Sequence, residues 1–144
     1  MPRFLVVDDD PATVTGLSQL LHEDGHEVAG FTSGSAAVEA LGSGTFDVVL
    51  ADLEMPVVDG RAVMRAARDA HPNACLVVVT ARPEEKLREL VEAGVCVIAD
   101  KPFDYDEVMR TVADCRARGG PSEPGRCHAR HRPHGPQLES LRRK

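Results

Sequence analysis

The segment FLVVDDD at residues 4–10 decides how this chain folds, because a short apolar run ends there directly in three aspartates. A second apolar run, VVLA at residues 48–51, ends in the same way at Asp52. Continuous apolar runs of this length are typical of parallel strands that are buried on both faces. Since the carboxyl ends of parallel strands meet at one edge of a sheet, we expect Asp8, Asp9 and Asp52 to lie together.

A cation is expected among these aspartates. Carboxylates that are gathered at one point repel one another and raise one another's pKa, unless a positive charge lies between them. Oxygen-only ligands of this kind suit Mg²⁺. The sequence therefore predicts a magnesium site at the carboxyl edge of the sheet.

Strand and helix signals alternate over residues 3–118, with short connections between them. The expected strands cover residues 3–8, 26–31, 47–52, 75–80 and 95–99. The expected helices cover residues 11–24, 35–41, 61–70 and 84–93, and a last helix opens at the capping-box pattern of Asp104 and Glu107. Five strands that alternate with five helices predict an α/β fold, a doubly wound parallel sheet with helices on both faces.

Charge is distributed unevenly along the 144 residues. Residues 1–118 hold 11 Lys/Arg against 21 Asp/Glu, whereas residues 119–144 hold six against two. An acidic domain with a short basic tail offers no basic face for duplex DNA, so direct DNA binding is not expected. With one tyrosine, four phenylalanines and no tryptophan, base-stacking platforms for single-stranded nucleic acid are not expected either.

The cysteine pattern and the apolar runs bear on the compartment. The four cysteines form no CxxC pair and lie mostly in apolar stretches, so we interpret them as reduced and structural. No charged-then-apolar leader precedes the first strand. No apolar run approaches the roughly 20 residues that span a bilayer. We therefore expect a cytoplasmic protein that does not enter a membrane.

The last part of the chain has a different composition. The segment GGPSEPG at residues 119–125 favours neither helix nor strand, and Arg, His and Pro dominate residues 126–144. This composition predicts a disordered basic tail over residues 119–144. The spacing CHARHRPH at residues 127–134 could bind zinc, but it matches no known finger, and a solvated tail is the favoured interpretation. Docking of the tail to an acidic partner is a further alternative.

Chemically reactive side chains lie at the ends of four of the five expected strands: Asp8 and Asp9, Asp52, Thr80, and Lys101. Taken singly, each could be an ordinary polar residue at a strand end, and Asp10 before Pro11 is foremost a helix cap. Taken together, they predict three acids, a hydroxyl and an amine at one edge of the sheet.

Four motifs in this order resemble one family. They are FLVVDDD, DVVLADLEMPVVDG, VVVTA and DKPF, spread over residues 3–118. The chain resembles a response-regulator receiver domain of two-component signalling, of the single-domain chemotaxis type. The resemblance implies a flavodoxin-like fold with five parallel strands in the order 2-1-3-4-5 and five helices, with the receiver domain over residues 1–118.

The resemblance also implies a role for each residue of the site. Asp52 matches the phosphoacceptor, and Thr80 and Lys101 match the hydroxyl and the amine that contact the phosphoryl group. Asp8, Asp9 and the backbone carbonyl of Glu54 match the groups that hold Mg²⁺ together with Asp52. The Lys101–Pro102 peptide bond would be cis.

Two positions depart from the family pattern: Ile98, and Asp100, which is unusually polar for its place directly before Lys101 and is a rival partner for that lysine. Ile98 replaces a residue that is often aromatic, so a switch signal would have to travel through Thr80, Ala81 and the fourth helix. Glu54 and Arg82 flank the site with opposite charges, and we hypothesise that they pair over the phosphoryl group and slow the attack of water. An ordinary solvated surface pair is an equally good interpretation.

The resemblance predicts a single-domain response regulator that accepts a phosphoryl group from a sensor histidine kinase or a phosphotransfer protein. It would be a phosphoacceptor rather than an enzyme, a monomer or a weak homodimer, and it would signal to a downstream protein by contact. One alternative is a receiver-like scaffold that binds its partner without phosphorylation. Another is a small magnesium-dependent phosphatase with an aspartyl nucleophile, which the lack of a substrate-covering insertion disfavours.

Overall fold

The computed structural model describes residues 2–81 and 83–117. It contains five strands, β1 (Arg3–Val7), β2 (Glu27–Phe31), β3 (Val48–Asp52), β4 (Cys75–Thr80) and β5 (Val97–Asp100). The helices are α1 (Pro11–Glu23), α2 (Gly34–Ser43), α3 (Gly60–Ala70), α4 (Pro83–Glu92) and α5 (Tyr105–Ala117). The predicted alternation is confirmed. The predicted basic tail and Arg82 lie outside the described residues.

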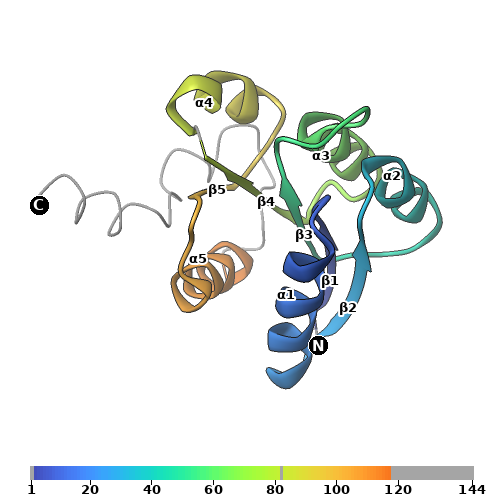
Figure 1. The fold of residues 1–144 in the computed structure, drawn as a ribbon, viewed down its shortest axis with the longest axis vertical. Helices are drawn as coiled ribbons and strands as arrows, with labels where there is room; N and C mark the ends of the chain where they lie inside the picture. Colours follow the sequence, from blue (N-terminus) through green and yellow to red (C-terminus); the bar gives the residue numbers. More distant parts are fainter. Residues whose placement is uncertain (1, 82, 118–144) are drawn as a thin grey trace, which may run out of the picture.

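The five strands form one parallel sheet in the order β2-β1-β3-β4-β5. This is the predicted flavodoxin-like order (Figure 1). The order reverses at β1, which pairs with β2 on one side and with β3 on the other. The crevice beyond the carboxyl ends of β1 and β3 is where sheets of this kind bind their ligands.

Each face of the sheet carries its own apolar core. Leu17 and Leu21 of α1 and Val108 and Val112 of α5 are buried on one face. On the other face α2, α3 and α4 pack against the sheet, as Figure 1 shows, and Leu90 of α4 is fully buried there. Because both faces are covered, β3 and β4 are buried along their whole length, which explains their continuous apolar sequences.

Most helix and strand boundaries lie within one residue of the sequence predictions, and two of them differ by two residues. Gly42 predicts a helix end at residue 41, but α2 continues to Ser43 and is capped by Gly44. An exposed glycine inside a helix costs only about 1 kcal/mol, and burial of Leu41 favours the longer helix. The strand expected over residues 95–99 instead spans Val97–Asp100, because the N–H of Val95 still bonds the carbonyl of Leu90 near the end of α4, at 3.1 Å.

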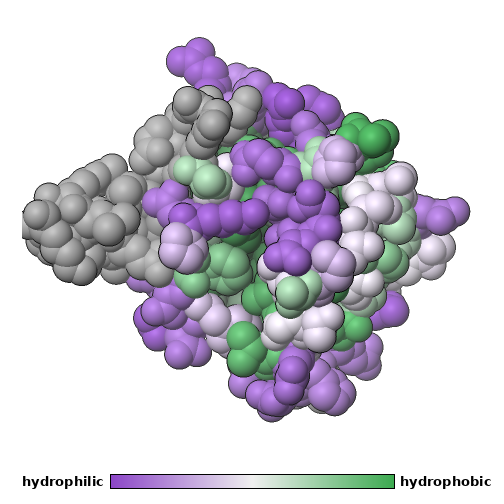
Figure 2. Space-filling view, viewed as in Figure 1, coloured by the Kyte–Doolittle hydropathy of each residue, from purple (hydrophilic) through white to green (hydrophobic). Residues whose placement is uncertain are grey.

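One face of the molecule is largely hydrophilic (Figure 2). In the view of Figure 2, polar side chains dominate and apolar ones form small, separate patches. Among the described residues, the large hydrophobic side chains that are exposed are Leu20 and Val57. In this same part of the chain, no helix combines the length and the apolar character needed to cross a bilayer.

Candidate functional site

Three carboxylates meet at the carboxyl edge of the sheet. Asp52 is the last residue of β3, and Asp8 and Asp9 directly follow β1. The side chains of these three residues offer oxygen atoms that all lie within 4.8 Å of one another. Asp52 is 2% exposed and Asp8 is 6% exposed, whereas Asp9 is open to solvent. The predicted convergence of the three acids is confirmed.

The backbone around Asp10 sets the orientation of Asp8. The backbone N–H of Asp10 donates to Asp8 Oδ1 at 2.9 Å, and the N–H of Asp8 donates to the carbonyl of Phe31 at 3.2 Å. Asp10 itself caps α1, since its Oδ1 accepts from the N–H of Ala12 at 3.1 Å. Asp8 therefore directs its carboxylate into the site, whereas Asp10 caps α1 as predicted.

Lys101 brings a positive charge to the acids. Its Nζ lies 2.8 Å from Asp52 Oδ1, and its backbone N–H donates to the carbonyl of Thr80 at 3.0 Å. The Lys101–Pro102 peptide bond is cis, as the resemblance implied. The ammonium group is therefore held over the buried carboxylate by the end of β4 and by the turn after β5.

The electrostatics of the site favour a further cation. Burial raises the pKa of Asp52 despite the ion pair with Lys101, and the negative charges of Glu54 and Asp9 raise it further. Burial also raises the pKa of Asp8, with a contribution from the charge of Asp52. Burial alone would lower the pKa of Lys101, but its bond to Asp52 raises it. One ammonium group does not fully compensate three clustered carboxylates, so their oxygens fit a divalent metal ion.

Glu54 makes a contact at the site that the sequence analysis did not predict. Its Oε2 accepts a hydrogen bond of 2.7 Å from Oγ1 of Thr80, which is fully buried at the end of β4. The hypothesis of a pair between Glu54 and Arg82 stays a prediction, since Arg82 lies outside the described residues. Sequence reasoning missed the bond between Glu54 and Thr80. The sequence signal extends only to the shared edge of the sheet: Thr80 ends β4, and Glu54 lies in the loop after the adjacent strand β3.

Ile98 and Ala81 lie in different environments. Ile98 is fully buried in the core and pairs with Val78 in the register of β4 and β5. Ala81 is exposed and directly follows Thr80. The part of Ile98 and Ala81 in a switch stays a prediction.

A network of charges at the start of α3 supports the loop after β3. Asp59 caps α3, and its Oδ1 accepts from the N–H groups of Arg61 and Ala62 at 3.1 and 3.2 Å. Arg61 bonds Asp59 Oδ2 at 3.1 Å and Glu89 of α4 at 2.9 Å. Gly60 lies so close to the end of β3 that an added Cβ would stand 2.7 Å from the carbonyl oxygen of Asp52. The loop that carries Glu54 is thus tied to two helices.

Replacement of Asp59 by alanine is expected to lower the free energy of unfolding by about 1 kcal/mol at neutral pH, the usual effect of losing a helix cap. Burial alone would raise the pKa of Asp59, but hydrogen bonds from Ala62 and Arg61 lower it below 3.8. A lowered pKa stabilises the fold above the unfolded-state value, and this stabilisation is lost as the pH falls below about 4.

Urea unfolding of wild type and Asp59→Ala between pH 7 and pH 3.5 measures this effect. The difference between the two proteins should shrink as the pH falls. Asp69→Ala, at an exposed position in the last turn of the same helix, is the matched control and should change little. A difference that grows towards low pH would contradict the assignment.

Comparison with known proteins agrees with this geometry. The sequence model of the family described as the response regulator receiver domain matches residues 4–113. The chain is 33% identical over 108 residues to the DNA-binding transcriptional regulator NtrC of Escherichia coli, covering 74% of this chain and 23% of NtrC. It is 35% identical over 117 residues to the sensor protein GacS of Pseudomonas syringae, covering 77% of this chain and 13% of GacS. The chain thus spans a quarter or less of the length of these relatives.

Solved structures share the fold over nearly their full length. The response regulator TrrA of Thermotoga maritima, solved in complex with Mg²⁺ and BeF, has a TM-score of 0.70 and 30% identity, covering 79% of this chain and 98% of TrrA. The receiver domain of the sensor histidine kinase PA1611 of Pseudomonas aeruginosa, solved with a magnesium ion in its active-site cleft, has a TM-score of 0.70 and 27% identity, covering 78% of this chain and 95% of that domain. With its strand order and its acidic edge, the chain belongs to the response regulator receiver domain family.

Proposed function

We propose that this receiver domain accepts a phosphoryl group on Asp52 from a phosphohistidine of a sensor kinase or a phosphotransfer protein, in a reaction that requires Mg²⁺. The observation that carries the proposal is the ion pair between Asp52 and Lys101 beside two further carboxylates at one edge of the sheet. The phosphorylated domain would signal through contact with a downstream protein. Its action as a single-domain regulator and its cytoplasmic location stay predictions.

The residues of the site suit phosphoryl transfer. An oxygen of the Asp52 carboxylate would form the new bond to phosphorus while the bond from phosphorus to the histidine nitrogen breaks. The ammonium group of Lys101 lies 2.8 Å from Asp52. During the transfer it would stabilise the negative charge on the phosphoryl oxygens. The groups that would hold Mg²⁺ are Asp8, Asp9, Asp52 and the backbone carbonyl of Glu54. TrrA and the receiver domain of PA1611, which share this fold, were solved with Mg²⁺. Bound Mg²⁺ supplies positive charge to the acids and to the phosphoryl oxygens.

Thr80 couples the chemistry to the surface in this proposal. Its hydroxyl donates to Glu54 and must leave that bond before it can donate to a phosphoryl oxygen. The movement would take the backbone of Ala81 with it, next to the start of α4. The signal would thus pass from the phosphoryl group to the surface between β4 and α4.

Glu54→Ala is expected to speed phosphorylation by a small phosphodonor about fivefold. The substitution removes a negative charge that opposes the incoming phosphoryl group, and it frees Thr80 from a hydrogen bond with a net strength of about 1 kcal/mol. The rate of phosphoryl gain with acetyl phosphate and Mg²⁺ measures the effect. Glu54→Gln is the matched control, because it keeps an acceptor for Thr80 without the charge. A slower reaction of Glu54→Ala would contradict this role.

Intact mass after incubation with acetyl phosphate or phosphoramidate tests the proposed function. Wild type should gain one phosphoryl group with Mg²⁺ and none with a chelator, and Asp52→Asn should gain none in either case. A gain that persists in Asp52→Asn would reject Asp52 as the acceptor. Absence of both phosphoryl gain and Mg²⁺ binding would favour the scaffold that acts without phosphorylation. Repeated turnover of a phosphomonoester would instead identify a phosphatase.

A further inference from the structure

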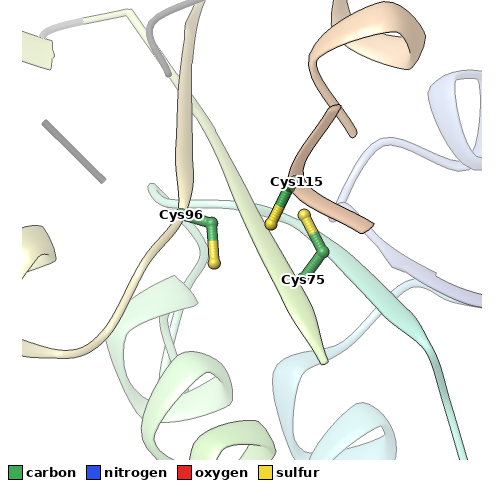
Figure 3. Close-up of side chains that lie close together, drawn as sticks. All are labelled: Cys75, Cys96 and Cys115. Atoms are coloured by element: carbon green, nitrogen blue, oxygen red, sulfur yellow. The ribbon is translucent and has the colours of Figure 1, made fainter. Parts of the chain in front are cut away.

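Three cysteine thiols meet at the edge of the sheet opposite the aspartates. Cys75 begins β4, Cys96 directly precedes β5, and Cys115 lies in the last turn of α5. Figure 3 shows the three side chains turning into the space between these elements. Each residue is at most 1% exposed, and the sulfur atoms lie within 4.8 Å of one another. We call Cys75, Cys96 and Cys115 the trithiol cluster.

A guanidinium group is fixed beside the trithiol cluster. Arg68 Nη2 lies 3.7 Å from the Sγ of Cys96. The same side chain donates to the backbone carbonyls of Pro72 at 2.6 Å, Ala74 at 3.0 Å and Gly94 at 2.5 Å. Its position is therefore set by the backbone and not by the thiols. Because the guanidinium keeps its charge at any physiological pH, it stabilises negative charge that develops on the neighbouring sulfur.

The surroundings of Cys75 favour its protonated form. Hydrogen bonding to Cys115 and Cys96, together with burial, raises the pKa of Cys75 well above its usual value. A single buried cysteine needs no explanation beyond packing, since cysteine is among the most buried residue types. Convergence of three thiols from three separate elements, with a permanent cation at their side, is an arrangement that also suits ligand binding.

We propose that the trithiol cluster is a binding site for a soft monovalent cation with three sulfur ligands, represented by Cu(I). Soft thiolate ligands select Cu(I), zinc or iron–sulfur clusters. A structural zinc site takes four ligands, whereas this cluster, within the described residues, is made of three cysteines without a neighbouring His, Asp or Glu. Cu(I) is stable with three ligands and does not need the fourth.

The geometry requires little movement. Three sulfur atoms at about 2.3 Å from a metal in their plane stand about 4 Å apart. The thiols of the trithiol cluster, which lie within 4.8 Å of one another, would therefore have to approach by less than about 1 Å. Helix ends open locally at a small cost in free energy, so the last turn of α5, which carries Cys115, provides the route of entry.

The charges of the complex balance in the apolar core. Cu(I) replaces the protons of two thiols, and these two protons leave to solvent. The third sulfur binds as a thiol, and no atom changes its oxidation state. The complex then has one negative charge, which the guanidinium of Arg68 offsets. Cys75 and Thr80 stand at opposite ends of β4, roughly 16 Å apart for a strand of this length. Binding of Cu(I) therefore leaves the aspartate site free.

Anaerobic titration of the full chain with Cu(I), against bicinchoninate as a competing chelator, tests this site. Cys127→Ser is the reference protein, because it removes the thiol that lies outside the described residues. We expect it to bind one Cu(I), with three sulfur neighbours at about 2.3 Å by X-ray absorption. Cys115→Ala in the same background should bind more than about 100-fold more weakly, since even the loss of an outer-shell partner lowers affinity 10- to 100-fold.

The midpoint of urea unfolding in the presence of a chelator shows whether Cys115→Ala is folded. The X-ray absorption spectrum of Cys127→Ser tests the site with all three cysteines of the trithiol cluster in place. Nitrogen or oxygen neighbours, or fewer than three sulfurs around the copper, would overturn the proposal. So would unchanged affinity in a folded Cys115→Ala. A loss of two hydrogens in mass without retained copper would show a disulfide in place of a metal site, and this too would overturn it.

Discussion

Lys101→Met is expected to slow phosphorylation of Asp52 by about 100-fold or more, at saturating Mg²⁺ and with the same phosphodonor as wild type. The ammonium group lies 2.8 Å from Asp52 Oδ1, and in the proposed reaction it would face the phosphoryl oxygens. Removal of one preorganised electrostatic contact of this kind typically lowers a rate by about 10²–10³. Methionine keeps the length and the apolar stem of lysine, so the loss would report on the charge.

Lys101→Arg is the matched control for this experiment. It keeps the positive charge but replaces a compact ammonium by a planar fork, so an intermediate rate is expected. The time course of phosphoryl gain by intact mass measures all three proteins. If Lys101→Met accepted the phosphoryl group at the wild-type rate, the ion pair with Asp52 would have no part in the transfer and would only stabilise the apo fold.

Asp8→Asn is expected to change the stability of the domain in opposite directions without and with Mg²⁺. In a chelator the variant should be more stable than wild type by an amount on the order of 1 kcal/mol. The reason is that Asp8 is 6% exposed and that burial and the charge of Asp52 both raise its pKa, so its ionised form destabilises the fold. Asparagine keeps the oxygen that accepts from the N–H of Asp10.

In Mg²⁺ the order should reverse, because a ligand that binds only the folded state stabilises it by an amount that grows with the logarithm of the ligand concentration divided by Kd. Loss of a direct carboxylate ligand is expected to weaken Mg²⁺ binding by about 100-fold or more. Thermal unfolding as a function of Mg²⁺ concentration measures both effects. Asp9→Asn is the control, since the exposed Asp9 should show a weaker gain in chelator. Equal stability of Asp8→Asn and wild type in both conditions would exclude Asp8 from a metal site.

The two proposed sites lie at opposite edges of the sheet. Oxygen ligands gather where the strands end, around Asp52, and sulfur ligands gather where β4 begins, around Cys75. Hard and soft cations would thus be separated by the length of one strand. Phosphorylation of Asp52 and Cu(I) binding can therefore be measured independently on the same protein.

Much of the fold and most of the aspartate site could be predicted from the sequence by local rules. Buried parallel strands have continuous apolar sequences, and their carboxyl ends share an edge, so Asp8, Asp52 and Thr80 could be placed together without coordinates. Caps such as Asp10 act within a few residues and are visible in the sequence itself. Local signals were insufficient at Gly42. Glycine often ends a helix, but burial of the neighbouring Leu41 favours a helix that continues to Ser43.

Tertiary structure alone decided which side chains from different elements touch. The bond between Glu54 and Thr80 depends on where a loop returns over the adjacent strand, and no local pattern encodes that path. The trithiol cluster depends on the register of β4 and β5 and on the rotation of α5, which brings together cysteines about twenty residues apart in the chain. Sequence patterns determine the elements and their ends because those depend on short-range sterics and burial. Contacts between elements depend on packing of the whole core, which is a property of the folded chain.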